Sequence, residues 1–211
     1  MIDAVVQERR PEARSLLDVA CGTGRHLEQL RHRYAVEGID LDDGLLAVAR
    51  RRLPDVPLHV GDMRGFHLGR TFDAVTCLFS AIGYLATPVE LDAAIAAMGR
   101  HLEPGGVLVV EPWLKPGEWT PDRPALLTVD EPDLKVARIS MSGLRGTTSL
   151  LDFHYLVATP HGVESATEHL ELELFTQDET IAAFERAGLD VSYDEQGLIG
   201  RGLYVGVRPG A

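Results

Sequence analysis

The sequence contains little cysteine, and this scarcity limits its chemistry. Only two of the 211 residues are cysteine. Cys21 lies beside a glycine and Cys77 lies inside an apolar run, so neither has the spacing of a disulfide framework or of a zinc site. A reducing, cytoplasmic location is therefore expected.

Basic residues are also scarce relative to acidic ones. The chain has 20 lysines and arginines against 32 aspartates and glutamates, and its net charge is −12. A protein with this charge has no long-range attraction for phosphate backbones, so a nucleic-acid partner is not expected. Among the eight histidines no pair has a helical spacing that favours a metal site, and none is predicted.

Long apolar runs are absent as well. No stretch approaches 18 apolar residues, and residues 1–14 are polar and charged. The sequence therefore predicts neither a membrane span nor a signal peptide. It also lacks internal repeats, low-complexity tracts and linkers. One domain over residues 1–211 is the expected organisation.

What the chain does contain is an alternation of short apolar runs and helical patterns. Such alternation is typical of a parallel sheet covered by helices, as in Rossmann-like α/β folds. Helices are expected over residues 45–53 and 91–102, and a tight turn over residues 103–106. The strands expected for this sheet are residues 15–19, 34–41, 56–60, 72–79, 107–111, 191–193 and 203–207.

The alternation of strands and helices stops after the fifth strand. Residues 113–175 contain apolar–polar alternation separated by glycine-containing turn signals, which indicates an antiparallel β-layer inserted into the domain. A capping box between Thr176 and Glu179 then starts a last helix, which is expected to end with Gly188 as its C-cap. The inserted strands are expected at residues 126–130, 134–142, 147–158 and 163–175.

One stretch near the N-terminus organises the rest. Residues 15–19 form a predicted buried strand, and Gly22 and Gly24 follow in a turn before a helix. Glycine has no Cβ, so the backbone can turn sharply there and a ligand can approach it closely. The first N–H groups of the helix have no partners within the helix and point toward the turn. A ligand site is expected here, although an ordinary tight turn has the same glycine spacing.

Two kinds of ligand suit a glycine turn of this kind. A dinucleotide loop needs Gly-x-Gly-x-x-Gly, but Ala20 replaces its first glycine and the third is missing. The Asp18 carboxylate before the turn would repel a pyrophosphate and suit a cation. The pattern Asp18-x-Ala20-x-Gly22-x-Gly24 resembles motif I of class I S-adenosylmethionine (SAM) methyltransferases. That ligand carries a sulfonium and an ammonium group and no phosphate.

Acidic residues end two further predicted strands. Asp40 lies 22 residues after Asp18 (40 − 18). At this spacing nucleotide-binding folds place the carboxylate that binds the ribose hydroxyls. A helix N-cap is the alternative, which Asp42 or Asp43 also fits. In SAM methyltransferases the acid after the third strand accepts a hydrogen bond from the adenine amino group, and its apolar neighbour packs on the ring, which implies these roles for Asp62 and Met63. The residues predicted to bind SAM are Asp18, Ala20, Gly22, Gly24, Asp40, Leu41, Asp62, Met63 and Phe79.

Six short motifs carry a closer resemblance within the SAM methyltransferases, at residues 16–24, 61–64, 74–80, 109–113, 154–157 and 200–203. With them the sequence resembles a narrower group, the sugar N,N-dimethyltransferases of macrolide biosynthesis, which act on dTDP-3-amino-deoxysugars of the desosamine and mycaminose type. The resemblance implies SAM-dependent methyl transfer to the amine of a nucleotide-linked amino-deoxysugar in antibiotic biosynthesis. It also implies a homodimer that packs through the inserted β-layer.

The resemblance implies roles for residues outside the SAM site as well. Tyr84 and His154 are predicted to be catalytic; the group tends to have histidine where this chain has Tyr84, and tyrosine is a poor base at neutral pH. Members of the group have a tyrosine-containing N-terminal segment that closes over the cofactor. Only 14 residues precede Ser15 here and none is tyrosine, so a site open on one side is expected. The residues predicted to bind the substrate are Ser80, Glu111, Trp113 and Arg201. The alternatives are that His154 is a surface residue of an inserted strand, that Arg201 belongs to a β-turn, and that Trp113 is an interior anchor.

Three other functions remain open from the sequence. The protein is an enzyme that methylates another small metabolite, or it binds SAM without catalysis, or it is an NAD-linked dehydrogenase. The glycine pattern disfavours the dehydrogenase, because that class needs the third glycine of its loop.

Overall fold

The computed structural model of the chain describes residues 1–210 and contains two β-sheets. The chain divides into two compact units. The first is made of Met1–Trp113 together with the chain from Thr176 onward, and the second is Leu114–Phe175. The second unit begins one residue after the predicted start of the inserted β-layer. That the two units act as a single domain stays a prediction.

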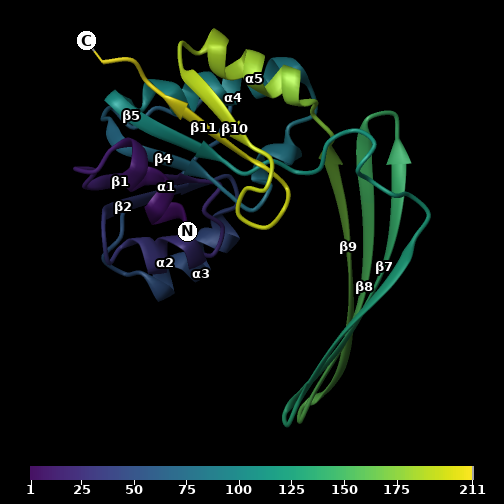
Figure 1. Ribbon diagram of the computed structural model, residues 1–211. Helices are drawn as coiled ribbons and strands as arrows, with labels where there is room; N and C mark the ends of the chain where they lie inside the picture. Colours follow the sequence, from purple (N-terminus) through teal and green to yellow (C-terminus); the bar gives the residue numbers. More distant parts are fainter. Residues whose placement is uncertain (211) are drawn as a thin grey trace. The chain divides into compact units, whose positions relative to one another are not determined.

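The sheet of the first unit has seven strands (Figure 1). From edge to edge these are β10 (Asp190–Asp194), β11 (Leu203–Val207), β5 (Leu102–Val110), β4 (Phe72–Cys77), β1 (Ser15–Val19), β2 (Ala35–Asp40) and β3 (Leu58–Val60). Strands β1 to β5 are parallel, and β11 is antiparallel to both β5 and β10. The prediction of a Rossmann-like sheet is confirmed.

Helices cover both faces of this sheet (Figure 1). Figure 1 shows α1 (Ile2–Arg9), α2 (Arg25–Leu30) and α3 (Asp43–Arg52) on one face, and α4 (Pro88–Arg100) and α5 (Gln177–Arg186) on the other. A short 3₁₀ helix, η1 (Ala81–Tyr84), follows β4. Within residues 1–210 no helix has the length and apolar character needed to cross a membrane.

Side-chain caps fix where the helices start. Asp42 caps α3 by accepting a hydrogen bond from the Leu45 N–H at 3.0 Å, which leaves Asp40 free of that role. The capping box between Thr176 and Glu179 is confirmed at the start of α5. The C-cap of α5 is Ala187, not Gly188 as predicted. Gly188 is the next residue, at φ +74°, because the left-handed residue that ends a helix lies one position beyond the cap.

One predicted turn is part of a strand. Leu102 pairs with Phe72 and Val107 pairs with Ala74, so residues 103–106 bulge out within β5. The turn signal there reflects Gly105, at φ +74°, which bends the strand without ending it. The remaining strand positions agree with the predictions to within a few residues.

The second unit is a four-stranded antiparallel sheet in the order β6-β7-β8-β9. It confirms the predicted antiparallel β-layer; the first two strands are three residues longer than expected, and the other two are shifted by one or two residues at their ends. Two turns, residues 131–134 and 159–162, lie at one end of the sheet, and the turn at residues 145–148 lies at the other. The strands are β6 (Pro124–Glu131), β7 (Leu134–Arg145), β8 (Thr148–Thr159) and β9 (Gly162–Glu173).

The first unit leaves no room for a side chain at Gly38 of β2. A Cβ added there would lie 2.7 Å from both Cys21 Sγ and Leu27 Cδ1, and 2.8 Å from Leu58 Cδ2. Gly38 therefore lets the turn after β1, helix α2 and strand β3 pack closely around β2. This packing fixes the turn that leads into the predicted ligand site.

The packing at Gly38 gives a direct test of the fold. Gly38→Ala is expected to lower the free energy of unfolding by about 1–3 kcal/mol, because the added methyl group overpacks the interior. Gly99→Ala is the matched control, since Gly99 lies in α4 and a Cβ there has only an ordinary contact, 3.5 Å from Leu189 Cδ1. That control should stabilise the protein by about 0.5–1 kcal/mol. Denaturant melts of the two variants check both signs, and equal stabilities would contradict the argument.

Candidate active site

The carboxyl ends of the parallel strands meet at one edge of the seven-stranded sheet, where open α/β sheets bind ligands. The predicted site residues of the first unit lie in the last two residues of these strands, in the segments that follow them, or in the segment before β11. Hydrogen bonds between the loops show how the structure brings several of these residues together.

The turn after β1 is tied to the end of β2. The Gly22 N–H donates to Asp40 Oδ2 at 2.7 Å, and the Asp42 N–H donates to Asp40 Oδ1 at 2.9 Å. Ala20, Gly22 and Gly24 all have positive φ, at 58°, 54° and 76°. For Ala20 this conformation costs about 1–2 kcal/mol, so the turn has a shape that the local sequence alone does not favour. Beside it, Leu41 is 68% exposed and is available to cover a ligand.

Asp18 lies in β1, two residues before this turn begins, and is buried. Its Oδ1 accepts a hydrogen bond from the Thr76 hydroxyl at 2.7 Å, whereas its Oδ2 has no partner among the described residues. Burial raises the pKa of Asp18 to about 6, opposed by the Thr76 hydrogen bond and by nearby His26, and Asp40 adds to the increase. A buried carboxylate with an unused oxygen attracts a cationic or N–H-donating group.

Asp62, after β3, is held by an arginine that the sequence analysis did not single out. Arg64 Nε lies 3.0 Å from each carboxylate oxygen of Asp62, and its Nη2 lies 2.5 Å from Oδ2. Arg64 also pairs with Glu90 in the first turn of α4. The hydrogen bonds from Arg64 lower the pKa of Asp62, so this carboxylate is ionised at neutral pH. Met63, between the two charged residues, is half-buried.

The loop after β4 is joined to the end of β5. Phe79 and Ser80 are both left-handed, at φ 55° and 62°. The Phe79 N–H donates to Glu111 Oε2 at 2.7 Å, and the Ser80 hydroxyl donates to the Pro112 carbonyl at 2.8 Å. The Phe79 side chain is 73% exposed, whereas Glu111 is only 4% exposed.

The segment just before β11 contacts the same loop. Arg201 Nη1 donates to Ser80 Oγ at 3.0 Å, and the Arg201 guanidinium carbon lies 4.6 Å above the centre of a Trp113 ring. Planar guanidinium groups stack on aromatic faces in this way. Three of the four predicted substrate-binding residues, Ser80, Trp113 and Arg201, therefore form one cluster.

The two predicted catalytic residues belong to different units. Tyr84 ends η1 in the first unit and is 58% exposed. His154 lies on β8 in the second unit, paired with Ile139 of β7 and Thr167 of β9, and its side chain is exposed. The catalytic roles of both residues stay predictions.

Comparisons with known proteins decide the family. Residues 16–106 match the family model described as "Methyltransferase domain". A dTDP-3-amino-3,6-dideoxy-alpha-D-glucopyranose N,N-dimethyltransferase from Streptomyces fradiae is 48% identical over 210 residues, which cover 99% of this chain and 82% of that protein. This chain belongs to the same methyltransferase family. It is a SAM-dependent methyltransferase.

Solved structures agree with this placement. The methyltransferase is 47% identical to DesVI of Streptomyces venezuelae, with a TM-score of 0.95 over 98% of this chain and 89% of that one. It is 46% identical to SAM-bound CalS10, an amino pentose methyltransferase from Micromonospora echinaspora involved in calicheamicin biosynthesis. The two structures superpose with a TM-score of 0.92, and the match covers 98% of this chain and 88% of CalS10.

The residues of the methyltransferase fit its cofactor. SAM carries two cationic groups, and Asp18, whose Oδ2 has no partner among the described residues, comes just before a turn with three left-handed residues. The ligand carries no phosphate, which agrees with carboxylates at the ends of β1 and β2 and just after β3, and with the negative net charge. A dinucleotide would bring a pyrophosphate against these carboxylates, so the dehydrogenase alternative does not fit.

The raised pKa of Asp18 predicts how SAM binding depends on pH. Asp18 is ionised above a pH of about 6, and its negative charge then favours a cationic ligand. SAM affinity should therefore fall as the pH drops below about 6, approaching tenfold per pH unit. Asp18→Asn should bind SAM more weakly at pH 8 and lose this dependence between pH 5 and 8.

Calorimetric titration with SAM over that pH range checks the prediction. Asp62→Asn is the matched control, since the pKa of Asp62 is lowered and its carboxylate stays ionised over the range. The control should keep the pH dependence of the parent even if its SAM affinity falls. A parent protein with pH-independent binding would show that Asp18 does not face the cation.

Proposed function

We propose that this methyltransferase transfers methyl groups from SAM to the amine of a nucleotide-linked amino-deoxysugar. The observation that carries the proposal is the extent of the similarity. The general methyltransferase model matches residues 16–106, whereas the S. fradiae amino-sugar enzyme aligns along 99% of the chain, through the second unit and the Arg201 cluster. A use in antibiotic biosynthesis and a cytoplasmic location complete the proposal.

The proposed roles on the cofactor side follow the geometry of the loops. Asp40 binds the ribose hydroxyls, since its two oxygens are already oriented by backbone N–H groups. Asp62 accepts from the adenine amino group, and Leu41 and Met63 pack on the ring. Asp18 and the glycine turn take the cationic end.

The group that accepts the methyl is an amine. SAM supplies an electrophilic methyl group, and only the neutral amine has a lone pair to attack it. Holding the amine in line is worth roughly 7–11 kcal/mol, so positioning matters more than a strong base. We assign this positioning to the Tyr84 hydroxyl, which accepts a hydrogen bond from the amine. Because a tyrosine hydroxyl is a poor base at pH 7, the proton released after transfer goes to solvent.

The nucleotide side of the substrate is assigned to the Arg201 cluster. Arg201 is a permanent cation with N–H groups in a planar fork, which suits the oxygens of a diphosphate. Its position is fixed by Ser80 Oγ and by the Trp113 ring. Arg201 therefore supplies positive charge beside the otherwise acidic strand ends.

Methyl transfer to a dTDP-3-amino-deoxysugar, measured with SAM by mass spectrometry of the product, tests the function. We expect one or two methyl groups on the sugar amine and none on the matching 3-hydroxy sugar. Tyr84→Phe should lower kcat by about tenfold and leave the Kd for SAM unchanged, since its hydroxyl touches only the acceptor. No transfer to any nucleotide-linked amino sugar would reject the proposal, and unchanged kcat in Tyr84→Phe would reject the role of Tyr84.

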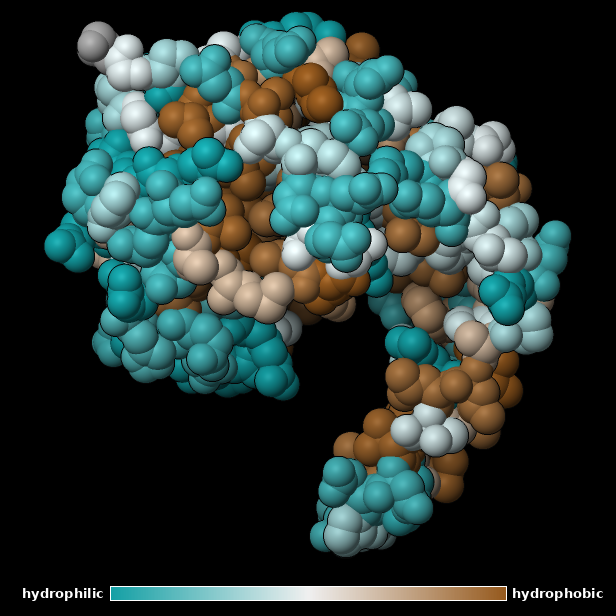
Figure 2. All heavy atoms as spheres, viewed as in Figure 1, coloured by the Kyte–Doolittle hydropathy of each residue, from teal (hydrophilic) through white to brown (hydrophobic). Residues whose placement is uncertain are grey.

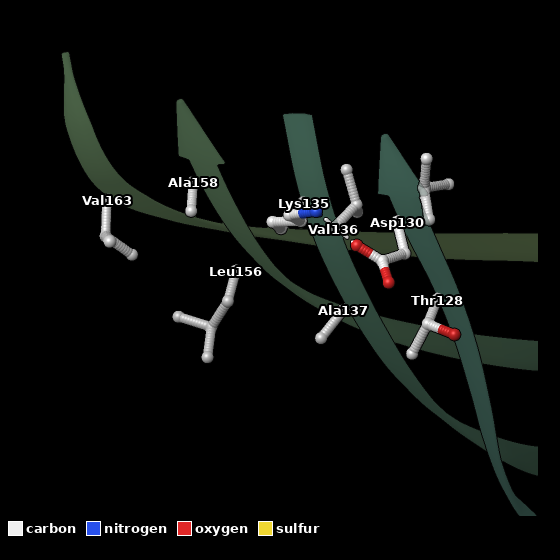
Figure 3. Close-up of a pocket in the computed structure, with 9 residues that line it drawn as sticks. Thr128, Asp130, Lys135, Val136, Ala137, Leu156, Ala158 and Val163 are labelled. Atoms are coloured by element: carbon white, nitrogen blue, oxygen red, sulfur yellow. Dashed lines mark hydrogen bonds and ion pairs between the residues drawn. The ribbon is translucent and has the colours of Figure 1, made fainter. Parts of the chain in front are cut away.

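The proposed homodimer rests on the sheet of the second unit. One face of this sheet carries exposed large apolar side chains from every strand, and we call it the apolar face. Figure 2 shows apolar residues gathered along the sheet up to a hydrophilic tip. In Figure 3 the side chains of Ala137, Leu156 and Val163, from β7, β8 and β9, line a hollow of about 430 Å³ near that tip. The apolar face comprises Leu126, Ile139, Met141, Leu156 and Val163, which are 67%, 52%, 41%, 56% and 70% exposed.

A second copy of the chain suits the apolar face, because a twofold axis buries the same patch on both subunits. Ile139→Glu is expected to shift the protein from dimer to monomer at micromolar concentration in sedimentation runs. Leu127→Glu is the matched control: Leu127 is 46% exposed and lies on the opposite face, paired with Arg138. A parent protein that sediments as a monomer, or a control that dissociates as readily as Ile139→Glu, would contradict the interface.

A further inference from the structure

The loop after β4 contains the least favourable backbone of the candidate site. Phe79 and Ser80 are consecutive non-glycine residues in the left-handed region, at φ 55° and 62°. Bulky residues rarely adopt this conformation. Phe79 is 73% exposed, so burial of its ring does not compensate for the strained backbone. Residues held in this way occur where the surrounding structure imposes the conformation, most often at functional sites.

The Glu111 carboxylate is hydrogen-bonded to the backbone of this turn. Its Oε2 accepts the Phe79 N–H at 2.7 Å, a short N–H···O hydrogen bond. Glu111 is itself fixed by the sheet, because its own N–H donates to the Cys77 carbonyl at 2.9 Å. Glu111, directly after β5, therefore holds Phe79, which lies two residues after the end of β4. Glu111 is 4% exposed, which leaves little of it for contact with a sugar.

We propose that Glu111 is a positioning residue that keeps the Phe79–Ser80 turn left-handed and thereby holds the Phe79 side chain at the SAM-binding edge. Glu111 then acts through Phe79, and not by direct contact with the substrate as the sequence predicted. The inference rests on the proposed function in one respect, which is that SAM binds at this edge of the seven-stranded sheet.

A double-mutant cycle separates positioning from direct contact. Glycine adopts the left-handed region freely, so Phe79→Gly no longer needs the anchor. The variants are Glu111→Ala, Phe79→Gly and the double variant, each measured for the Kd of SAM by calorimetry and for Tm. In the parent background Glu111→Ala should weaken SAM binding by about tenfold. In the Phe79→Gly background the same change should cost less than about threefold.

Two further variants sharpen the cycle. Glu111→Gln keeps an acceptor oxygen for the Phe79 N–H and should retain SAM affinity to within about threefold of the parent. Glu103→Ala is the control on the same strand; its carboxylate pairs with Thr71, and it should leave the Kd of SAM unchanged in both backgrounds. Phe79→Gly alone should raise Tm while weakening SAM binding, since the strain is removed together with the ring.

Each outcome of the cycle decides the proposal. An equal loss of SAM affinity from Glu111→Ala in both backgrounds would overturn it, because the carboxylate would then touch the ligand directly. No loss in either background would also overturn it. If the Glu111→Ala variant folds only when Phe79→Gly is also present, this difference in stability confirms that Glu111 anchors the turn. If it folds in neither background, the proposal is overturned. SAM binding needs no sugar, so a failed methyl-transfer assay would count against the proposed function and leave this inference standing.

Discussion

The Asp40 carboxylate is the contact on which the cofactor side of the site depends. It accepts one backbone N–H from the glycine turn after β1 and another from the residue that caps α3. Two loops that are far apart along the backbone are therefore fixed by one side chain. Gly22 and Gly24 adopt their left-handed conformation freely, and this contact helps to hold Ala20, which does not. The close approach of the chain at Gly38 provides the packing that makes this arrangement possible.

The carboxyl edge of the sheet and the acidic residues on it could be predicted from the sequence. Parallel strands place their ends together, so Asp18, Asp40 and Asp62 could be grouped from spacing alone. The sequence does not choose between Asp42 and Asp43 as the cap of α3, and the structure assigns this role to Asp42. The prediction of a turn at residues 103–106 is wrong, because glycine signals do not distinguish a turn from a bulge within a strand.

The long-range anchoring contacts could not be predicted, because they depend on tertiary structure. The pair between Arg64 and Asp62 is local, two positions apart in a turn, but the contact of Arg64 with Glu90, which connects that turn to α4, is not. No sequence pattern marks Glu111 as the acceptor for the Phe79 N–H. The sequence offers no signal for the positive φ of Phe79 either, since aromatic residues normally avoid it.

The contact between Ser80 and Arg201 spans 121 positions of the chain and has a consequence for biosynthesis. The ribosome has made β1 to β5 and the carboxylates at the ends of β1 and β2 and just after β3 long before Arg201 leaves the exit tunnel. A nascent chain can thus assemble the cofactor half of the site early, while the half assigned to the sugar nucleotide waits for Arg201. A chain released before Arg201 would lack the cation beside Trp113 and Ser80. The order of synthesis therefore separates the two halves in time as well as in chemistry.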